Sequence, residues 1–96
     1  MRQLIVSLEA VDDLEGIALY VSKDKPAAAE NFISRVWERF ELLSQHPFLG
    51  EARPEFGSNR RSCVVGSYVV YYEISPSELR IARVLHGARD LRALGW

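Results

Sequence analysis

The sequence predicts an α+β domain of order β-α-α-β-β-β, in which a helical hairpin packs on a small, mostly antiparallel sheet. Three observations support this prediction. Apolar residues recur at helical spacing in the first half of the chain, residues 68–74 are almost continuously β-branched or aromatic, and short turn signals separate the apolar runs of the second half. The chain has 96 residues, which is enough for one core and too few for two, so we expect residues 1–96 to form a single domain.

The first strand and the first helix are expected within residues 3–22. Residues 3–8 are apolar enough for a short strand, and Ser7 is placed to cap the helix that follows. The helix should end within residues 22–25, ahead of Pro26. Its apolar stripe consists of Val11, Leu14, Ile17, Ala18 and Val21.

The second helix is expected over residues 26–45. Proline suits the first helical turn because its missing N–H costs nothing there, and of the two residues before it Asp24 is a better cap than Lys25. The helix should end at His46, since a residue that precedes proline avoids helical geometry. The apolar side chains cover about half the circumference, which is more than one buried side needs. They are Ala29, Phe32, Ile33, Val36, Trp37, Phe40 and Leu43.

Strands are expected after a loop that covers residues 47–60. Gly66-Ser67 occupies the position of a two-residue hairpin turn, and a second turn is expected at residues 75–78. The tail over residues 88–96 is long enough for one helical turn. The three strands are expected over residues 62–65, 68–74 and 79–86.

The composition is that of a globular chain, with 48% hydrophobic and 26% charged residues, and it excludes several classes of protein. No apolar run approaches the roughly 20 residues of a membrane helix, and the N-terminal run is too short for a secretory signal, so no membrane partner is expected. The single cysteine, Cys63, is expected to be buried, and it fits a reducing cytoplasm. Because glycine-rich phosphate loops and metal-ligand spacings are absent from the sequence, we expect neither a cofactor nor a metal site.

Charge is distributed unevenly along the chain. The net charge of −1 argues against a general nucleic-acid binder. Residues 1–59 carry 6 basic and 10 acidic side chains, whereas residues 60–96 carry 6 basic and 3 acidic ones. All six basic residues of the second part are arginines, whose forked guanidinium suits carboxylate, phosphate and interface contacts. An ordinary solvated surface is the alternative explanation.

The end of the last strand is the best candidate for a functional surface, because a rigid strand holds side chains in place. Arg83, His86 and Arg89 lie there. We favour a protein-binding face, although an arginine and a histidine can also hold a phosphate and move a proton, which leaves nuclease chemistry open. A third alternative is a structural role, such as an ion pair of Arg89 with Asp90 or Glu73. His46, at a helix end, is expected to complete a cap.

Five motifs follow one another along nearly the whole chain. The first helix carries Ala10, Asp13, Leu14, Ile17 and Tyr20, and the second carries Pro26, Ala28, Ala29, Phe32 and Phe40. The later motifs are Leu43, His46, Pro47 and Gly50, then Val65, Gly66, Tyr68 and Tyr72, and finally residues 83–90. In this order the motifs resemble the ParE/RelE superfamily of toxin–antitoxin toxins, and its ParE-like branch in particular.

The resemblance implies a RelE/ParE-like fold and a toxin of a type II toxin–antitoxin system. ParE-like members poison DNA gyrase by binding it, whereas RelE-like members cut messenger RNA on the ribosome. Nuclease members carry an arginine where this chain has Val69, and they are strongly basic. Both differences favour a binding-type gyrase inhibitor over an endoribonuclease, because a hydrocarbon cannot neutralise a phosphorane. A degenerate relative that binds only its antitoxin is a third alternative.

The resemblance also implies two surfaces. The expected target-facing residues are Arg60, Arg61, Arg83, His86, Arg89 and Trp96; the first five are basic or imidazole side chains, and a nuclease would use Arg83, His86 and Arg89. The cognate antitoxin is expected to be ParD-like, with a ribbon-helix-helix DNA-binding domain, and to form a hetero-oligomer with the toxin. The wide apolar arc and an off-stripe leucine suggest its docking site. The expected antitoxin-binding residues are Leu19, Phe32, Val36, Trp37 and Phe40.

Overall fold

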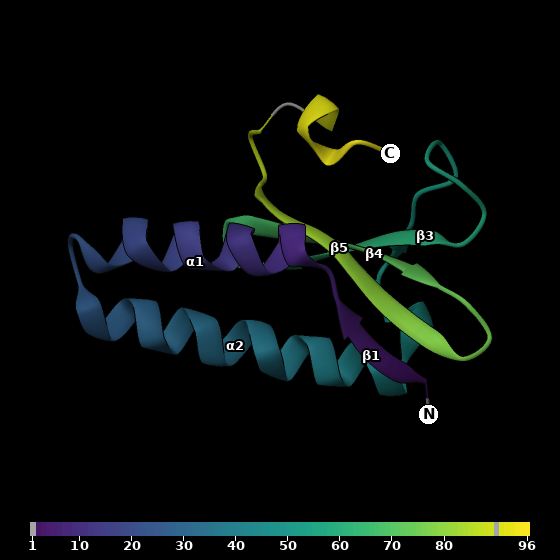
Figure 1. Cartoon of the computed structure of the whole chain (residues 1–96), viewed down its shortest axis with the longest axis horizontal. Coiled ribbons are helices and arrows are strands. Elements are labelled where there is room, and N and C mark those ends of the chain that lie inside the picture. The colour runs from purple at the N-terminus through teal and green to yellow at the C-terminus, as the bar shows by residue number, and fades with distance from the viewer. Residues whose placement is uncertain (1, 90) are drawn as a thin grey trace.

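The computed structural model describes residues 2–89 and 91–96, and it confirms the α+β class (Figure 1). Two helices lie side by side along one face of a five-stranded sheet, and the C-terminal segment turns back over the other face. In chain order the elements are β1 (Gln3–Val6), α1 (Leu8–Ser22), α2 (Pro26–Gln45), the 3₁₀ turn η1 (Pro47–Leu49), β2 (Glu51–Ala52), β3 (Arg60–Val65), β4 (Tyr68–Ile74), β5 (Glu78–His86) and the 3₁₀ turn η2 (Leu91–Leu94).

The strands are ordered β1-β5-β4-β3-β2. β1 pairs with β5 in parallel, from Gln3 opposite Glu78 to Val6 opposite Ile81, and every other pair is antiparallel. The mostly antiparallel sheet is therefore confirmed. β2 was not expected, since the sequence predicts a loop there and a two-residue strand has no detectable periodicity.

The N-terminus of α1 follows the predicted capping chemistry, whereas the N-terminus of α2 does not. Ser7 caps α1 as predicted, because its Oγ accepts the N–H of Ala10 at 3.0 Å. The prediction that Asp24 caps α2 is wrong, since Lys25 occupies the cap position and makes no side-chain cap hydrogen bond. The N–H of Asp24 still donates to the carbonyl of Val21, so Asp24 belongs to the end of α1 rather than to the start of α2.

The main core lies between the helices and the sheet, and it absorbs three residues that the sequence assigned to antitoxin binding. Val36 and Phe40 have no accessible surface and Phe32 has only 8%, so these three side chains cannot contact a partner. α2 packs against α1 as well as against β1, β3 and β5, which explains its wide apolar arc without a partner protein. The assignment of Phe32, Val36 and Phe40 to an exposed surface is therefore corrected.

A second, smaller cluster covers the face of the sheet away from the helices. Tyr71 and Leu85 are buried there under Leu94 of the C-terminal turn. The rings of Phe56 and Trp96 close the cluster at an edge-to-face distance of 5.6 Å between centroids. The predicted helical turn of the tail is confirmed, and its role is to cover this second face of the sheet.

Tyr72 joins the sheet to the end of the helical hairpin. Its hydroxyl donates to the carbonyl of Pro47 at 2.7 Å and accepts the N–H of Gly50 at 3.0 Å, and its ring is completely buried. A Cβ at position 50 would collide with this hydroxyl and with the carbonyl of Ser62, so the contact requires glycine. Burial is the main cause that raises the pKa of Tyr72 above its ordinary value.

The β3–β4 hairpin and its open edge also follow from local chemistry. Gly66 has φ +60° and Ser67 has no positive φ, as in a type II′ turn with glycine first. β2 covers only the first half of β3, and beyond it Arg39 donates to the carbonyl of Val64 at 3.1 Å and to Sγ of Cys63 at 3.0 Å. Cys63 is buried, as predicted.

We expect Tyr72→Phe to lower the free energy of unfolding by about 1–2 kcal/mol, because the buried N–H of Gly50 loses its acceptor. The raised pKa favours the neutral phenol in the folded chain, so the stability that this group contributes is complete below pH 10 and is lost as the pH rises through the folded-state pKa. Urea unfolding at pH 7 and pH 11 measures both effects. Tyr20→Phe, at an exposed ring, is the control, and an equal loss in that variant would contradict the assignment.

Candidate functional site

α1 covers the half of β5 that β1 leaves unpaired. β1 ends opposite Ile81, and the next outward-facing groups of β5 are bonded by α1 and its cap instead of by a strand. Ser7 donates its Oγ proton to the carbonyl of Ala82 at 2.7 Å, and Asp13 accepts the N–H of Val84 at 3.0 Å. The last strand is therefore held at the helix, with its end at His86 projecting beyond.

Asp13 and Arg83 form a two-point ion pair across this junction. Nε of Arg83 lies 2.8 Å from Oδ2 of Asp13, and Nη2 lies 2.8 Å from Oδ1. The side chains are 11% and 20% exposed, so the pair is largely shielded from water. The hydrogen bonds to Asp13 raise the pKa of Arg83, which keeps the guanidinium charged. Arg83 is therefore bound within the fold, so its guanidinium is not free for the predicted contact with a target.

Sequence reasoning missed this pair although both residues stood in its motifs. They are 70 positions apart, and no spacing rule links a helix position to a strand position at that distance. The sequence offers no other signal that singles out the pair, because α1 also carries Glu9, Asp12 and Glu15, and β5 also carries Glu78 and Arg80.

Arg60, Arg61 and Trp96 lie at the other end of the sheet from His86, since Arg60 is opposite Glu73 whereas His86 is opposite Tyr68. Arg60 donates to the carbonyl of Phe56 at 2.8 Å and lies 4.7 Å above the ring of Trp96.

Arg61 is likewise bound within the chain, because it donates to the carbonyl of Gly50 at 2.7 Å and stacks on Phe48. Glu73 pairs with Arg60 at 3.4 Å rather than with Arg89. The alternative partner for Arg89, Asp90, lies outside the described residues.

His86 and Arg89 are brought together at a hollow of about 310 Å³ between α1 and the end of β5, which we call the α1–β5 pocket. Both side chains are exposed. Nδ1 of His86 accepts the N–H of Ala88 at 3.1 Å, and the imidazole meets the ring of Tyr68 edge-on at 5.4 Å between centroids. The residues that line the pocket include Asp12, Gly16, Tyr20, Tyr68, His86 and Arg89.

A second hollow, of about 270 Å³, lies between the two helices, and its lining is mostly apolar. We call it the hairpin groove. It is lined by Val11, Leu14, Glu15, Ala18, Ile33 and Trp37. Trp37 is 41% exposed and rests edge-on against Phe40, with 5.2 Å between ring centroids. Leu19 is 66% exposed, and it belongs to α1, the helix that separates this groove from the α1–β5 pocket.

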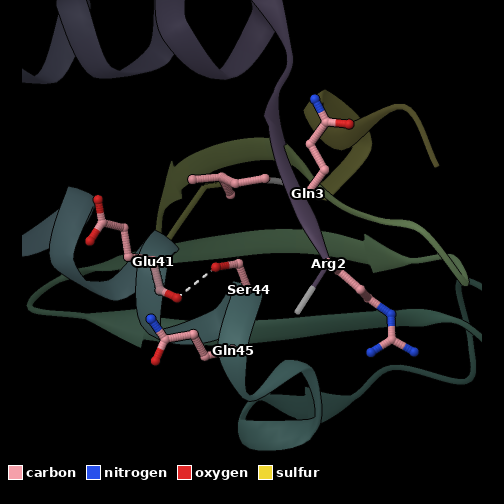
Figure 2. A pocket seen from close by; sticks show the side chains of 6 residues that line it. Arg2, Gln3, Glu41, Ser44 and Gln45 are labelled. Atoms are coloured by element: carbon pink, nitrogen blue, oxygen red, sulfur yellow. Dashed lines mark hydrogen bonds between the residues drawn. The ribbon is translucent and has the colours of Figure 1, made fainter.

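A third hollow, of about 580 Å³, lies between β1 and the end of α2, and none of the predicted site residues lines it (Figure 2). Its polar groups do not converge: the guanidinium of Arg2 and the carboxylate of Glu41 point away from one another. Arg2 instead donates to the carbonyl of Ser75, and Ser44 donates to the carbonyl of Glu41. This hollow therefore offers no catalytic arrangement.

Residues 2–89 and 91–96 contain no group of three His, Cys, Asp or Glu side chains that could hold a metal ion. No helix of the same ranges is both long and apolar enough to cross a lipid bilayer.

Comparison with known proteins gives concordant matches. A family model described as the ParE toxin of the type II toxin-antitoxin system, parDE, matches residues 4–91. Toxin ParE1 of Caulobacter vibrioides is 28% identical over 94 residues, which cover 97% of each chain. Putative toxin Y4kP of Sinorhizobium fredii is 30% identical over 82 residues, covering 83% of this chain and 82% of that protein.

Toxin RelE3 of Caulobacter vibrioides is 29% identical over 90 residues, covering 90% of this chain and 95% of that protein. Among solved structures, a chain of a chromosomal ParDE TA system from P. aeruginosa superposes with a TM-score of 0.74 at 22% identity. The superposition covers 90% of this chain and 96% of the other, and it shows that the two share a fold.

We expect Asp13→Asn to lower the free energy of unfolding by about 2 kcal/mol, because an amide presents only one acceptor and leaves the Arg83 guanidinium without its counter-charge. Chemical denaturation measures the shift in midpoint, with an unchanged slope if only stability is affected. The control is Glu55→Gln, which removes the charge of an exposed pair with Arg53 and should leave the stability nearly unchanged. Equal effects of the two substitutions would contradict a structural role for Asp13.

Proposed function

We infer the action of this chain from its family: it belongs to the ParE toxins of type II toxin–antitoxin systems, and we propose that it inhibits DNA gyrase by binding it. The observation that carries the proposal is the Asp13–Arg83 pair. A ribosome-directed nuclease would need Arg83, His86 and Arg89 to act on one phosphate, yet the guanidinium of Arg83 is held by α1. Position 69, where the nuclease relatives carry an arginine, is a half-buried valine.

Under this proposal His86 and Arg89 are the target-facing residues. They stand at the free end of β5, exposed and next to exposed Tyr20, whereas Arg60, Arg61 and Trp96 hold the far end of the sheet together. A protein partner would gain charge-assisted hydrogen bonds from both residues. No bond-making step is required of them.

We further propose that the hairpin groove receives an amphipathic helix of a ParD-like antitoxin. Trp37 and Leu19 remain from the predicted antitoxin surface, since Phe32, Val36 and Phe40 lie beneath it in the core. Acidic side chains border the groove: Glu15 lines it, and Glu30 and Glu41 are exposed one helical turn from Ile33 and Trp37. The complementary segment has an apolar ridge flanked by lysine or arginine.

The target is tested by adding the purified chain to a gyrase supercoiling assay and to a translating extract. We expect supercoiling to be inhibited while the messages stay intact. The double substitution His86→Ala with Arg89→Ala should weaken inhibition at least tenfold and keep the fold, because each lost charge-assisted hydrogen bond removes about 1.5–3 kcal/mol. Codon-phased cleavage of message would contradict the proposal in favour of a nuclease, and the absence of both effects would indicate a relative that binds only its antitoxin.

The antitoxin surface is tested with the product of the adjacent reading frame, by calorimetric titration. Leu19→Asp combined with Trp37→Ala should lower the affinity at least 100-fold, since a central aromatic anchor and an exposed leucine are removed together. The matched control is Leu49→Asp with Phe48→Ala, at two exposed apolar residues of η1 far from the groove, and its affinity should stay unchanged. Equal affinities of the wild type and the first variant would exclude the groove.

A further inference from the structure

Gly16 occupies a position in α1 for which the free protein shows no need of glycine. It lies in the middle of a 15-residue helix, where glycine is less stable than alanine because it loses more backbone entropy. A Cβ built at this position meets no atom within 4 Å, so close packing inside the chain does not explain the glycine. What the glycine provides is a low point in the helix surface, at which another backbone can approach closely.

This low point opens into the α1–β5 pocket, where hydrogen-bond donors gather. Arg89 is exposed there, and no partner of its guanidinium is found among residues 2–89 and 91–96. Because Nδ1 of His86 accepts the N–H of Ala88, its Nε2 carries the ring proton and is the nitrogen free to donate. Tyr20 and Tyr68 also line the pocket, and each carries a hydroxyl group that can donate a hydrogen bond.

The charges around the pocket favour a single carboxylate over a phosphate chain. Asp13 also lines the pocket, but Arg83 and the N–H of Val84 occupy both its oxygens. Asp12 remains as an exposed carboxylate at the mouth, and it would repel the repeated charges of a nucleic-acid backbone more strongly than one side-chain anion. The ligand that fits is therefore an aspartate or glutamate of a polypeptide.

We propose that the α1–β5 pocket binds an acidic residue of the antitoxin, carried by a segment that leaves the hairpin groove and crosses α1 over Gly16. The geometry supports this path because the two hollows lie on opposite flanks of one helix: Leu14 and Ala18 line the groove, and Gly16 lines the pocket. Leu19 is exposed one turn from Gly16 and offers the crossing segment an apolar contact. The identity of the partner rests on the proposed function, whereas the carboxylate site does not.

The site implies a way of neutralising the toxin. His86 and Arg89 are the residues assigned above to the target, so a segment seated on them blocks that surface directly. A segment confined to the hairpin groove would leave both side chains open, because α1 stands between the groove and the pocket.

The carboxylate site is tested by nuclear magnetic resonance on the ¹⁵N-labelled full chain. The probes are N-acetyl-glutamate methylamide, the corresponding glutamine compound and inorganic phosphate. We expect the glutamate compound to shift the amides of Gly16, His86 and Arg89 in a saturable manner, with the glutamine compound at least tenfold weaker. Arg89→Gln should abolish the shifts. An unresponsive pocket overturns the proposal, and phosphate binding as tight as glutamate overturns the choice of a polypeptide carboxylate.

The crossing is tested by Gly16→Ala. Because the added methyl group meets nothing in the free chain, this variant should raise Tm by about 5 °C, yet it should lower the affinity for the adjacent-frame product at least tenfold. Asn31→Ala is the matched control: it improves helix propensity at an exposed position of α2 and should leave the affinity unchanged.

The outcomes separate the two levels of inference. A Gly16→Ala variant that is more stable and binds equally well overturns the crossing. If the wild-type chain does not bind the product of the adjacent reading frame, that protein is not its antitoxin. The glutamate titration then still decides whether the pocket binds a carboxylate.

Discussion

The ion pair between Asp13 and Arg83 is the interaction on which the arrangement of this molecule depends. β1 is four residues long and leaves the outer edge of the second half of β5 without a strand, so the backbone groups on that edge must be bonded by something else. Asp13 bonds a backbone N–H of β5 and a side chain of β5 at the same time. The carboxylate thus fixes the position of α1 against the sheet, and with it the location of both hollows that flank this helix.

The local elements could be predicted from the sequence because each rests on nearby residues. Pro26 and Pro47 set the limits of α2, Ser7 caps α1, and Gly66 marks the β-turn. Periodicity also identified which residues of α2 are apolar, but it does not say what covers them. Phe32, Val36 and Phe40 were assigned to a partner because the arc looked too wide, and the chain itself proved to fill it from two sides.

The candidate site was predictable only in part, because local patterns do not show which residues far apart in the sequence come into contact. A sequence shows that an arginine is present, but not whether a carboxylate far along the chain already binds it. Arg60 and Arg61 bind backbone carbonyl groups and Arg83 binds a carboxylate, so three of the six arginines in residues 60–96 are bound within the fold. His86 and Arg89 differ because β5 ends at His86 and leaves both side chains exposed beside α1, where Gly16 also lines the pocket. That juxtaposition depends on how α1 and β5 cross, which no local pattern specifies.

The guanidinium of Arg39 at the open edge of β3 has a bearing on how the molecule behaves when it is alone. A strand edge with free carbonyls is a template on which identical chains can add laterally into ordered aggregates. Here the carbonyl beyond the short β2 is already bonded by a cation. A second copy that extended the sheet at this edge would have to displace the guanidinium or enclose its positive charge between the two strands, so addition of identical chains at this edge is disfavoured.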